Sequence, residues 1–253
     1  MPHDATAPLQ SPIDLTHAVP VPGLRPLDFR YRAGDIVQSV TLSIHNGACQ
    51  QGRLQAVPIL AVTLRPNAGL LRVGADAYRL RSLHWHTPAD HALDGRRPGM
   101  EMHLVHTHEQ TGALLVVGVH YREQPYPSTT APLLPIFSRF AELKSAATFH
   151  PPQLDLPELL PHAPRRYTSY RYDGSLTTAD DDGVFREGVQ WIVLRDQAPV
   201  SVALIHAHRA LVDADLRDLH FDGRETFDFQ RPRPQGNARA LQDRAGRTIE
   251  TEA

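Results

Sequence analysis

The sequence has a single cysteine, Cys49, among its 253 residues. One thiol cannot form an intrachain disulfide, and it cannot supply the thiolate cluster of a structural zinc site. Any bound metal would therefore have to be held by other ligands. Histidine is the natural alternative, because the chain carries fifteen of them.

The chain also lacks long apolar runs and a strong excess of charge. No apolar stretch approaches the length of a membrane span, and the formal net charge is −2. Nothing therefore suggests a nucleic-acid or membrane partner, and a small neutral substrate fits better. With 41% hydrophobic residues, the chain can bury one sizeable core. We expect one domain over residues 10–240, monomeric or homodimeric, with an N-terminal tail at 1–9 and a flexible C-terminal tail at 241–253.

No export signal is visible at the N-terminus. The segment from Met1 to Pro8 has neither a positively charged start nor an apolar stretch. As written, the sequence predicts a cytoplasmic protein. The protein would be periplasmic or secreted if translation starts further upstream.

Short runs rich in Val, Ile, Leu and Tyr alternate with clusters of Gly, Pro, Asn and Asp. Few stretches have a helical period, so the pattern predicts a mainly β protein. Strands are expected at residues 39–44, 59–64, 78–86, 100–108, 113–122 and 191–194, and helices at 132–144 and 201–212. The proline-rich segment 150–166 is expected to be a surface connection.

His84 and His86 stand one residue apart, and His103 follows in the motif Glu101-x-His103. In a β-strand, side chains two residues apart point to the same face, so His84 and His86 can both reach a metal. A neighbouring strand would supply His103. By the same parity, Glu101 can accept a hydrogen bond from the second ring nitrogen of His103, as metal-bound imidazoles usually require. Three neutral imidazoles leave a tetrahedral Zn²⁺ ion one open position, which is the catalytic pattern.

Other histidines form similar pairs but are not expected to bind metal. His106 and His108 have the opposite parity to His103, so on the same strand they face away from it. His106 is expected to be a hydrogen-bonded core residue. His206 and His208 lie in an expected helix, where residues two apart do not share a face.

Segments spread over nearly the whole chain match the pattern of one known family. In order, they are Gln10-Ser11-Pro12-Ile13-Asp14, Tyr78-Arg79-Leu80, Leu83-His84-Trp85-His86, Asp90-His91, Asp94-Gly95, Glu101-Met102-His103-Leu104-Val105-His106, Gly118, Gly174-Ser175-Leu176-Thr177-Thr178, Val189-Gln190-Trp191-Ile192-Val193-Leu194, Arg231-Pro232, Asn237 and Arg239. In this order and spacing, the chain resembles the α-class carbonic anhydrases, the eukaryotic-type family.

The resemblance implies an α+β fold on a large, mostly antiparallel central β-sheet with a few short peripheral helices. It also implies a Zn²⁺-dependent lyase that reversibly hydrates carbon dioxide to bicarbonate and a proton by a zinc-bound hydroxide, the behaviour for which carbonic anhydrase is the standard example. The substrate would be a small molecule, carbon dioxide or bicarbonate.

The resemblance further implies roles for residues around the metal. Thr177 would accept the hydroxide's proton in a hydrogen bond, and Asp90 would accept from Thr177 in turn, although the family more often has glutamate there. Tyr172 would support the site through its hydroxyl, and Ser82 and Asn237 would stand behind the metal ligands. An apolar wall would hold carbon dioxide beside the metal, with Thr178 next to it. Its residues would be Val105, Val116, Leu176, Val189 and Trp191.

Three features depart from the family pattern. Ala48 follows Asn46-Gly47 where fast members carry a proton-shuttling histidine, so water or buffer would carry the proton. Residues 179–185 are inserted after Thr178 and make that loop longer and acidic. Ser82 stands where glutamine commonly supports the first zinc histidine, and its short side chain would need a water to reach His84.

Two other interpretations remain open at this point. A catalytically weak or silent carbonic-anhydrase-like binding module is the main alternative, but such relatives typically lose one or more zinc histidines, so the intact set favours the enzyme. A cupin-like metalloenzyme is a more distant alternative, because His84-x-His86 followed by Asp90 resembles a His-x-His-acid motif. Iron or manganese in the purified protein would support it.

Overall fold

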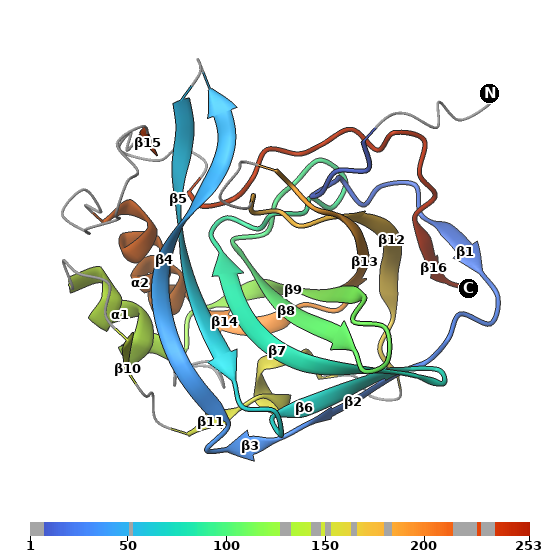
Figure 1. The fold of residues 1–253 in the computed structure, drawn as a ribbon, viewed down its shortest axis with the longest axis horizontal. Coiled ribbons are helices and arrows are strands. Elements are labelled where there is room, and N and C mark those ends of the chain that lie inside the picture. Colours follow the sequence, from blue (N-terminus) through green and yellow to red (C-terminus); the bar gives the residue numbers. More distant parts are fainter. Residues whose placement is uncertain are drawn as a thin grey trace.

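The computed structural model describes residues 8–50, 53–126, 133–142, 148–149, 153–162, 166–179, 184–214, 227–228 and 236–253. About half of these residues form strands, and nearly all of these strands belong to one large, curved sheet (Figure 1). Among the described residues, no helix is long and apolar enough to cross a membrane.

The elements, in chain order, are β1 Val19–Val21, β2 Leu27–Tyr31, β3 Ala33–Gly34, β4 Val37–Gln50, β5 Arg53–Leu64, β6 Gly69–Val73, β7 Asp76–His86, β8 Met100–His108, β9 Leu114–Gln124, α1 Leu134–Glu142, β10 Thr148–Phe149, β11 Leu154–Asp155, a 3₁₀ turn Pro157–Leu159, β12 Ser169–Ser175, β13 Glu187–Leu194, β14 Ala198–Ser201, α2 Val202–Asp213, β15 Phe227–Asp228 and β16 Glu250–Glu252. Every strand and helix expected from the sequence is present; the strand at 100–108 has the expected bounds, and the others have at least one shifted end.

The main sheet has the strand order β1-β16-β12-β13-β9-β8-β7-β5-β4-β10, and β2, β6, β14 and β15 pair beside this path. Most neighbours are antiparallel, whereas β1–β16, β9–β13, β9–β14 and β5–β15 are parallel. A separate small sheet joins β3 and β11. The expected fold class, a large and mostly antiparallel sheet with a few short helices, is confirmed.

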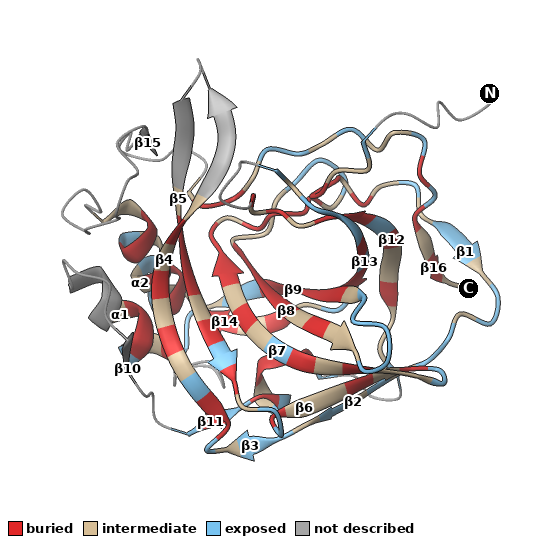
Figure 2. Cartoon of the chain, viewed as in Figure 1, coloured by how far each residue is buried: buried red, intermediate tan, exposed pale blue. Residues whose placement is uncertain are grey.

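The central strands are covered on both faces, which explains their nearly continuous apolar sequence. Figure 2 shows buried residues along most of β8 and β9. Leu115 and Val117 of β9 point into the larger core, together with residues of α1 and α2. Val116, between them, points into a smaller core that also contains Trp191. The two faces of the sheet therefore support two different environments.

The helices cover the larger core at one side of the sheet, where α1 and α2 lie next to each other (Figure 1). Ser201 caps α2, because its side chain accepts a hydrogen bond from the Leu204 backbone N–H. Trp85 of β7 is fully buried, and its ring centroid lies 5.1 Å from that of Phe137 in α1. With Trp85 fixed toward the helices, the alternation of the strand turns His84 and His86 to the opposite face.

The proline-rich segment 150–166 was expected to be a surface connection, and this expectation is wrong. In the proline-rich segment, Leu154, Leu156, Leu159 and Leu160 are buried in the larger core, so it is more than a surface connection. Its prolines interrupt regular structure without preventing its leucines from burying apolar area.

The C-terminal residues also do not form a loose tail. β16 pairs with both β1 and β12, and Ile249 is fully buried. Arg247 donates hydrogen bonds to the backbone oxygens of Gln10 and Asp173, which holds this segment against the domain. Residues 1–7 of the expected N-terminal tail lie outside the described residues.

Candidate metal centre

The register of β7 and β8 brings the three histidines of the sequence motif together. His84 is paired with His103, and His86 is paired with Glu101. Directly opposite residues of two antiparallel strands share a face. His84, His86, Glu101 and His103 therefore all project to the face away from the helices.

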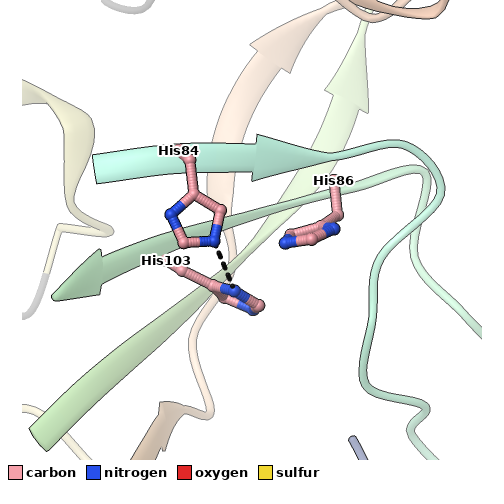
Figure 3. A group of neighbouring side chains, drawn as sticks. All are labelled: His84, His86 and His103. Atoms are coloured by element: carbon pink, nitrogen blue, oxygen red, sulfur yellow. Dashed lines mark hydrogen bonds between the residues drawn. The ribbon is translucent and has the colours of Figure 1, made fainter. Parts of the chain in front are cut away.

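The three rings converge on one point (Figure 3). One nitrogen from each of His84, His86 and His103 lies within 4.8 Å of the others. The distance between His103 Nδ1 and His84 Nε2 is 3.2 Å. His86 Nε2 is buried and has no hydrogen-bond partner. An unpartnered buried nitrogen that faces two others is what a three-histidine metal centre requires before the metal is bound.

For His86 and His103, the hydrogen bond of the outer nitrogen fixes which ring nitrogen can bind a metal. His86 Nδ1 donates to the backbone oxygen of Asn237 at 3.0 Å, so Nε2 keeps its lone pair. His103 Nε2 donates to Glu101 Oε1 at 3.0 Å, so Nδ1 keeps its lone pair. These partners supply the outer support that metal-bound imidazoles usually have. The donor set thus fits a zinc ion with three nitrogen ligands.

Burial also favours the neutral rings that metal binding needs. Burial lowers the pKa of His84 well below its ordinary value, and the neighbouring histidines His103, His86 and His45 lower it further. The pKa of His86 is lowered by burial, although the charge of Asp90 partly opposes this. Both rings are therefore neutral near pH 7, with a lone pair for a metal ion.

Asn237 ties a distant segment to the metal cluster. Its side-chain oxygen accepts from the Thr87 backbone N–H at 2.8 Å, and its amide nitrogen donates to the backbone oxygens of Pro58 and Trp85. The strand that carries His86 is therefore held by a residue near the C-terminus. Asn237 thus contacts His86 through its backbone oxygen and the neighbouring Thr87 through its side chain.

Tyr172 is buried and reaches the cluster through His91. Its hydroxyl oxygen lies 2.6 Å from His91 Nε2 and 3.0 Å from Ser11 Oγ. His91 Nδ1 donates in turn to Glu101 Oε1 at 2.7 Å. Burial raises the pKa of Tyr172 well above its ordinary value, so the hydroxyl keeps its proton. Tyr172 is thus connected to His103 through His91 and Glu101.

The expected hydrogen bond from Thr177 to Asp90 is absent from the described structure. Asp90 Oδ1 accepts from the Arg239 backbone N–H at 2.7 Å. Asp90 Oδ2 has no hydrogen-bond partner and lies 3.5 Å from His86 Nε2. Thr177 and Asp90 are both buried. The physical reason is the length of the side chain, because an aspartate held by Arg239 is one methylene shorter than the glutamate of the family.

The three departures from the family pattern have different outcomes. Ser82 makes no direct hydrogen bond to His84 in the described structure, in keeping with its short side chain. The Ala48 side chain and residues 180–183 of the insertion lie outside the described residues, as do Arg231 and Pro232. At the end of the insertion, the Arg239 guanidinium lies over the Phe185 ring, 3.3 Å from its centroid.

The expected apolar wall is brought together beside the histidines. Val116, Val189 and Trp191 are buried in the smaller core, and Val105 and Leu176 pack against it. The Trp191 ring centroid lies 4.9 Å from that of His103. The half-buried Thr178 follows Thr177 after β12. The face that carries the histidines is therefore apolar on one side.

The remaining histidines lie where strand parity and helix geometry place them. His106 is buried on the other face of β8, and its Nε2 lies 2.7 Å from the Tyr31 hydroxyl. In α2, His206 is exposed and His208 is buried. The expectation that His106 is a hydrogen-bonded core residue is confirmed.

Two further histidines on the metal face, His45 and His120, were not expected from the sequence. Strand pairing from β4 through β5 to β7 puts His45 on the same side as His84, and its Nε2 lies 2.9 Å from Ser43 Oγ. His120 of β9 is opposite Glu101. The parity of His120 with Gly118 and Val116 was a usable signal, but the pairing partner was not visible in the sequence.

A model of the family described as eukaryotic-type carbonic anhydrase matches residues 2–253. The chain belongs to this family. It is 27% identical over 214 residues to carbonic anhydrase Nec1 of Nesocodon mauritianus; the alignment covers 79% of this chain and 68% of the relative. It is 30% identical over 143 residues to dioscorin DB3S of Dioscorea polystachya; this alignment covers 55% of this chain and 49% of the relative.

Solved carbonic anhydrase structures share the fold. Carbonic anhydrase Cah3 from Chlamydomonas reinhardtii, solved in complex with acetazolamide, matches with a TM-score of 0.69 at 25% identity, over 98% of this chain and 92% of that one. The chain spans about half to two thirds of the length of the curated relatives described above. One of them is not named as an anhydrase, so membership of the carbonic anhydrase family does not by itself establish catalysis.

Proposed function

We propose that this protein is a zinc-dependent carbonic anhydrase that interconverts carbon dioxide and bicarbonate. The single observation that carries the proposal is the convergence of three imidazole nitrogens, with the tautomers of His86 and His103 fixed by Asn237 and Glu101. Two nitrogen ligands of neutral histidine and a third from His103 leave one position open in a tetrahedral site. That open position distinguishes a catalytic centre from a structural one.

In this proposal, His84, His86 and His103 hold the zinc ion through Nε2, Nε2 and Nδ1. When bound, zinc lowers the pKa of a water molecule to about 7 and so provides a nucleophile near neutral pH, as is established for carbonic anhydrases. Glu101 and Asn237 keep the rings oriented. The Thr177 hydroxyl would position the attacking water. The Arg239 backbone N–H holds the Asp90 carboxylate in place.

The apolar wall would bind the substrate. Carbon dioxide has no hydrogen-bond donor and no net charge, so apolar side chains accept it without loss of hydrogen bonds to water. Val116, Val189 and Trp191 are buried, while Val105 and Leu176 keep some exposure. We propose that Val105 and Leu176 form the accessible part of the wall.

Stopped-flow carbon dioxide hydration, with the zinc content measured in the same samples, tests the proposal. The wild type is expected to bind one zinc ion per chain and to be active, and His103→Ala is expected to lose both properties. His108→Ala is the matched control, because His108 lies on the same strand but on the other face. Acetazolamide, which binds the Chlamydomonas relative, is expected to inhibit by occupying the open metal position.

A binding module without significant catalysis is the second candidate. The observation that favours it is the unpartnered Asp90 Oδ2, which leaves Thr177 without the expected acceptor. This candidate also agrees with the similarity to dioscorin, a relative that is not named as a carbonic anhydrase. Wild-type protein that contains one zinc ion per chain but does not hydrate carbon dioxide would establish this candidate and reject the enzyme.

A further inference from the structure

Glu101 is surrounded by histidines, and one of them has no assigned role. His120 stands directly opposite Glu101 in the β8–β9 pairing. It is completely buried, and neither ring nitrogen has a hydrogen-bond partner. Its Nε2 lies 3.5 Å from Glu101 Oε2. A buried imidazole without partners carries a free-energy cost that an apolar residue at the same place would avoid.

The other contacts of Glu101 leave one place for a further donor. Oε1 accepts from His91 Nδ1 and from His103 Nε2, at 2.7 and 3.0 Å. Oε2 accepts only the His91 backbone N–H, at 2.8 Å. A carboxylate oxygen accommodates two donors, so Oε2 has an unused lone pair on the side of His120.

Gly118 shows how tightly this carboxylate is placed. A Cβ atom on Gly118 would come within 2.7 Å of Glu101 Oε1 and 3.2 Å of Val193. The carboxylate therefore packs directly against the backbone of β9, two residues before His120. Its position is defined by β9 as well as by His91.

We propose that His120 is a positioning residue whose Nε2–H donates to Glu101 Oε2 and fixes the carboxylate that orients His103. The inference rests on the proposed zinc site, and it concerns hydrogen bonding. With Oε2 held by His120 and the His91 backbone, Oε1 stays in line with His103 Nε2. His103 Nδ1 is then kept unprotonated and directed at the other two ligands.

The decisive variant is His120→Leu, which removes the donor at similar size. Loss of the hydrogen-bond partner of a metal ligand typically weakens metal binding 10- to 100-fold; His120 acts on that partner, Glu101, so we expect a loss at the lower end of this range, about tenfold. If His120 served only the packing, its replacement by leucine would leave the zinc affinity unchanged.

His120→Gln and His106→Leu are the matched variants. Glutamine retains an N–H donor and is expected to recover most of the zinc affinity. His106 is equally buried but faces the opposite side of β8, so its replacement is expected to leave zinc affinity unchanged. Zinc affinity is measured by competition with a chromophoric chelator, and hydration is measured on the same samples.

Several outcomes overturn the inference. His120→Leu with wild-type zinc affinity, or His120→Gln as weak as His120→Leu, shows that the donor is not used. If His120→Leu does not fold, the ¹⁵N chemical shifts of His120 in the wild type decide instead, and an Nδ1–H tautomer contradicts the proposal. Zinc binding that depends on His120 in a protein without hydration activity rejects the enzyme and keeps the inference. A wild type that binds no zinc rejects both.

Discussion

The buried His208 should make the stability of the metal-free protein depend on pH. It lies on the inner side of α2, fully buried, with its Nδ1 2.6 Å from Thr87 Oγ1. Burial lowers its pKa to about 3, and the charges of His86 and Arg209 act in the same direction. The ring is therefore neutral in the folded protein over the whole physiological range.

The sign follows from the comparison with the unfolded chain, in which a histidine has a pKa of about 6.5. The folded-state pKa is the lower one, so the unfolded chain binds the proton first as pH falls. The stability contributed by neutral His208 is fully present above about pH 6.5 and is lost as pH falls toward 3. Between pH 7 and pH 5 the unfolded imidazole becomes almost fully protonated, which corresponds to a loss of about 2 kcal/mol at about 1.4 kcal/mol per pKa unit.

Urea unfolding in the presence of a chelator measures this effect without a contribution from bound metal. The free energy of unfolding would be determined at pH 7 and pH 5 for the wild type and for His208→Gln, which has no titrating ring. We expect the wild type to lose about 2 kcal/mol more than the variant over this interval. His206→Gln is the matched control, because His206 is exposed on the same helix, and it should behave as the wild type.

The predicted effect is a difference between the pH profiles of the wild type and His208→Gln. His208→Gln changes the absolute stability by an amount that depends on its hydrogen bond to Thr87, and this part does not vary with pH. Parallel profiles for the wild type and His208→Gln would show that the ring is protonated in the folded protein or that the helix opens at low pH. Either result would refute the assignment of a neutral, buried His208.

Three further predictions concern the site. Asp90→Glu supplies the missing methylene, so we expect faster carbon dioxide hydration by stopped flow at unchanged zinc content; a slower variant would show that the contact with the Arg239 backbone matters more than the link to Thr177. Gly118→Ala pushes a Cβ atom into Glu101, so we expect about a tenfold loss of zinc affinity by chelator competition, and wild-type affinity would show that the carboxylate can move freely. With Ala48 at the usual shuttle position, hydration should rise strongly with buffer concentration in the wild type and equally in His45→Ala. A defect of His45→Ala confined to low buffer would instead assign proton transfer to His45.

The sequence alone determined the elements that carry the site and the faces of its ligands. Strand parity is a local geometric rule, so His84 and His86 had to share a face once β7 was a strand, and Glu101 and His103 had to share one in β8. The same rule placed His106 on the opposite face. The helix α2 was also expected from the sequence, at residues 201–212.

Only the tertiary structure decided which residues meet. The pairing of His84 with His103, and of Glu101 with His120, depends on strand register. The contact of Asn237 with His86 and the pairing of β16 with β12 join segments that are distant in sequence, so no local pattern predicts them. Asp90 accepts from the backbone N–H of Arg239, a residue distant in sequence, and not from Thr177. Local spacing fixes the direction of a side chain, whereas contacts between distant segments are fixed by packing, which depends on all of the chain at once.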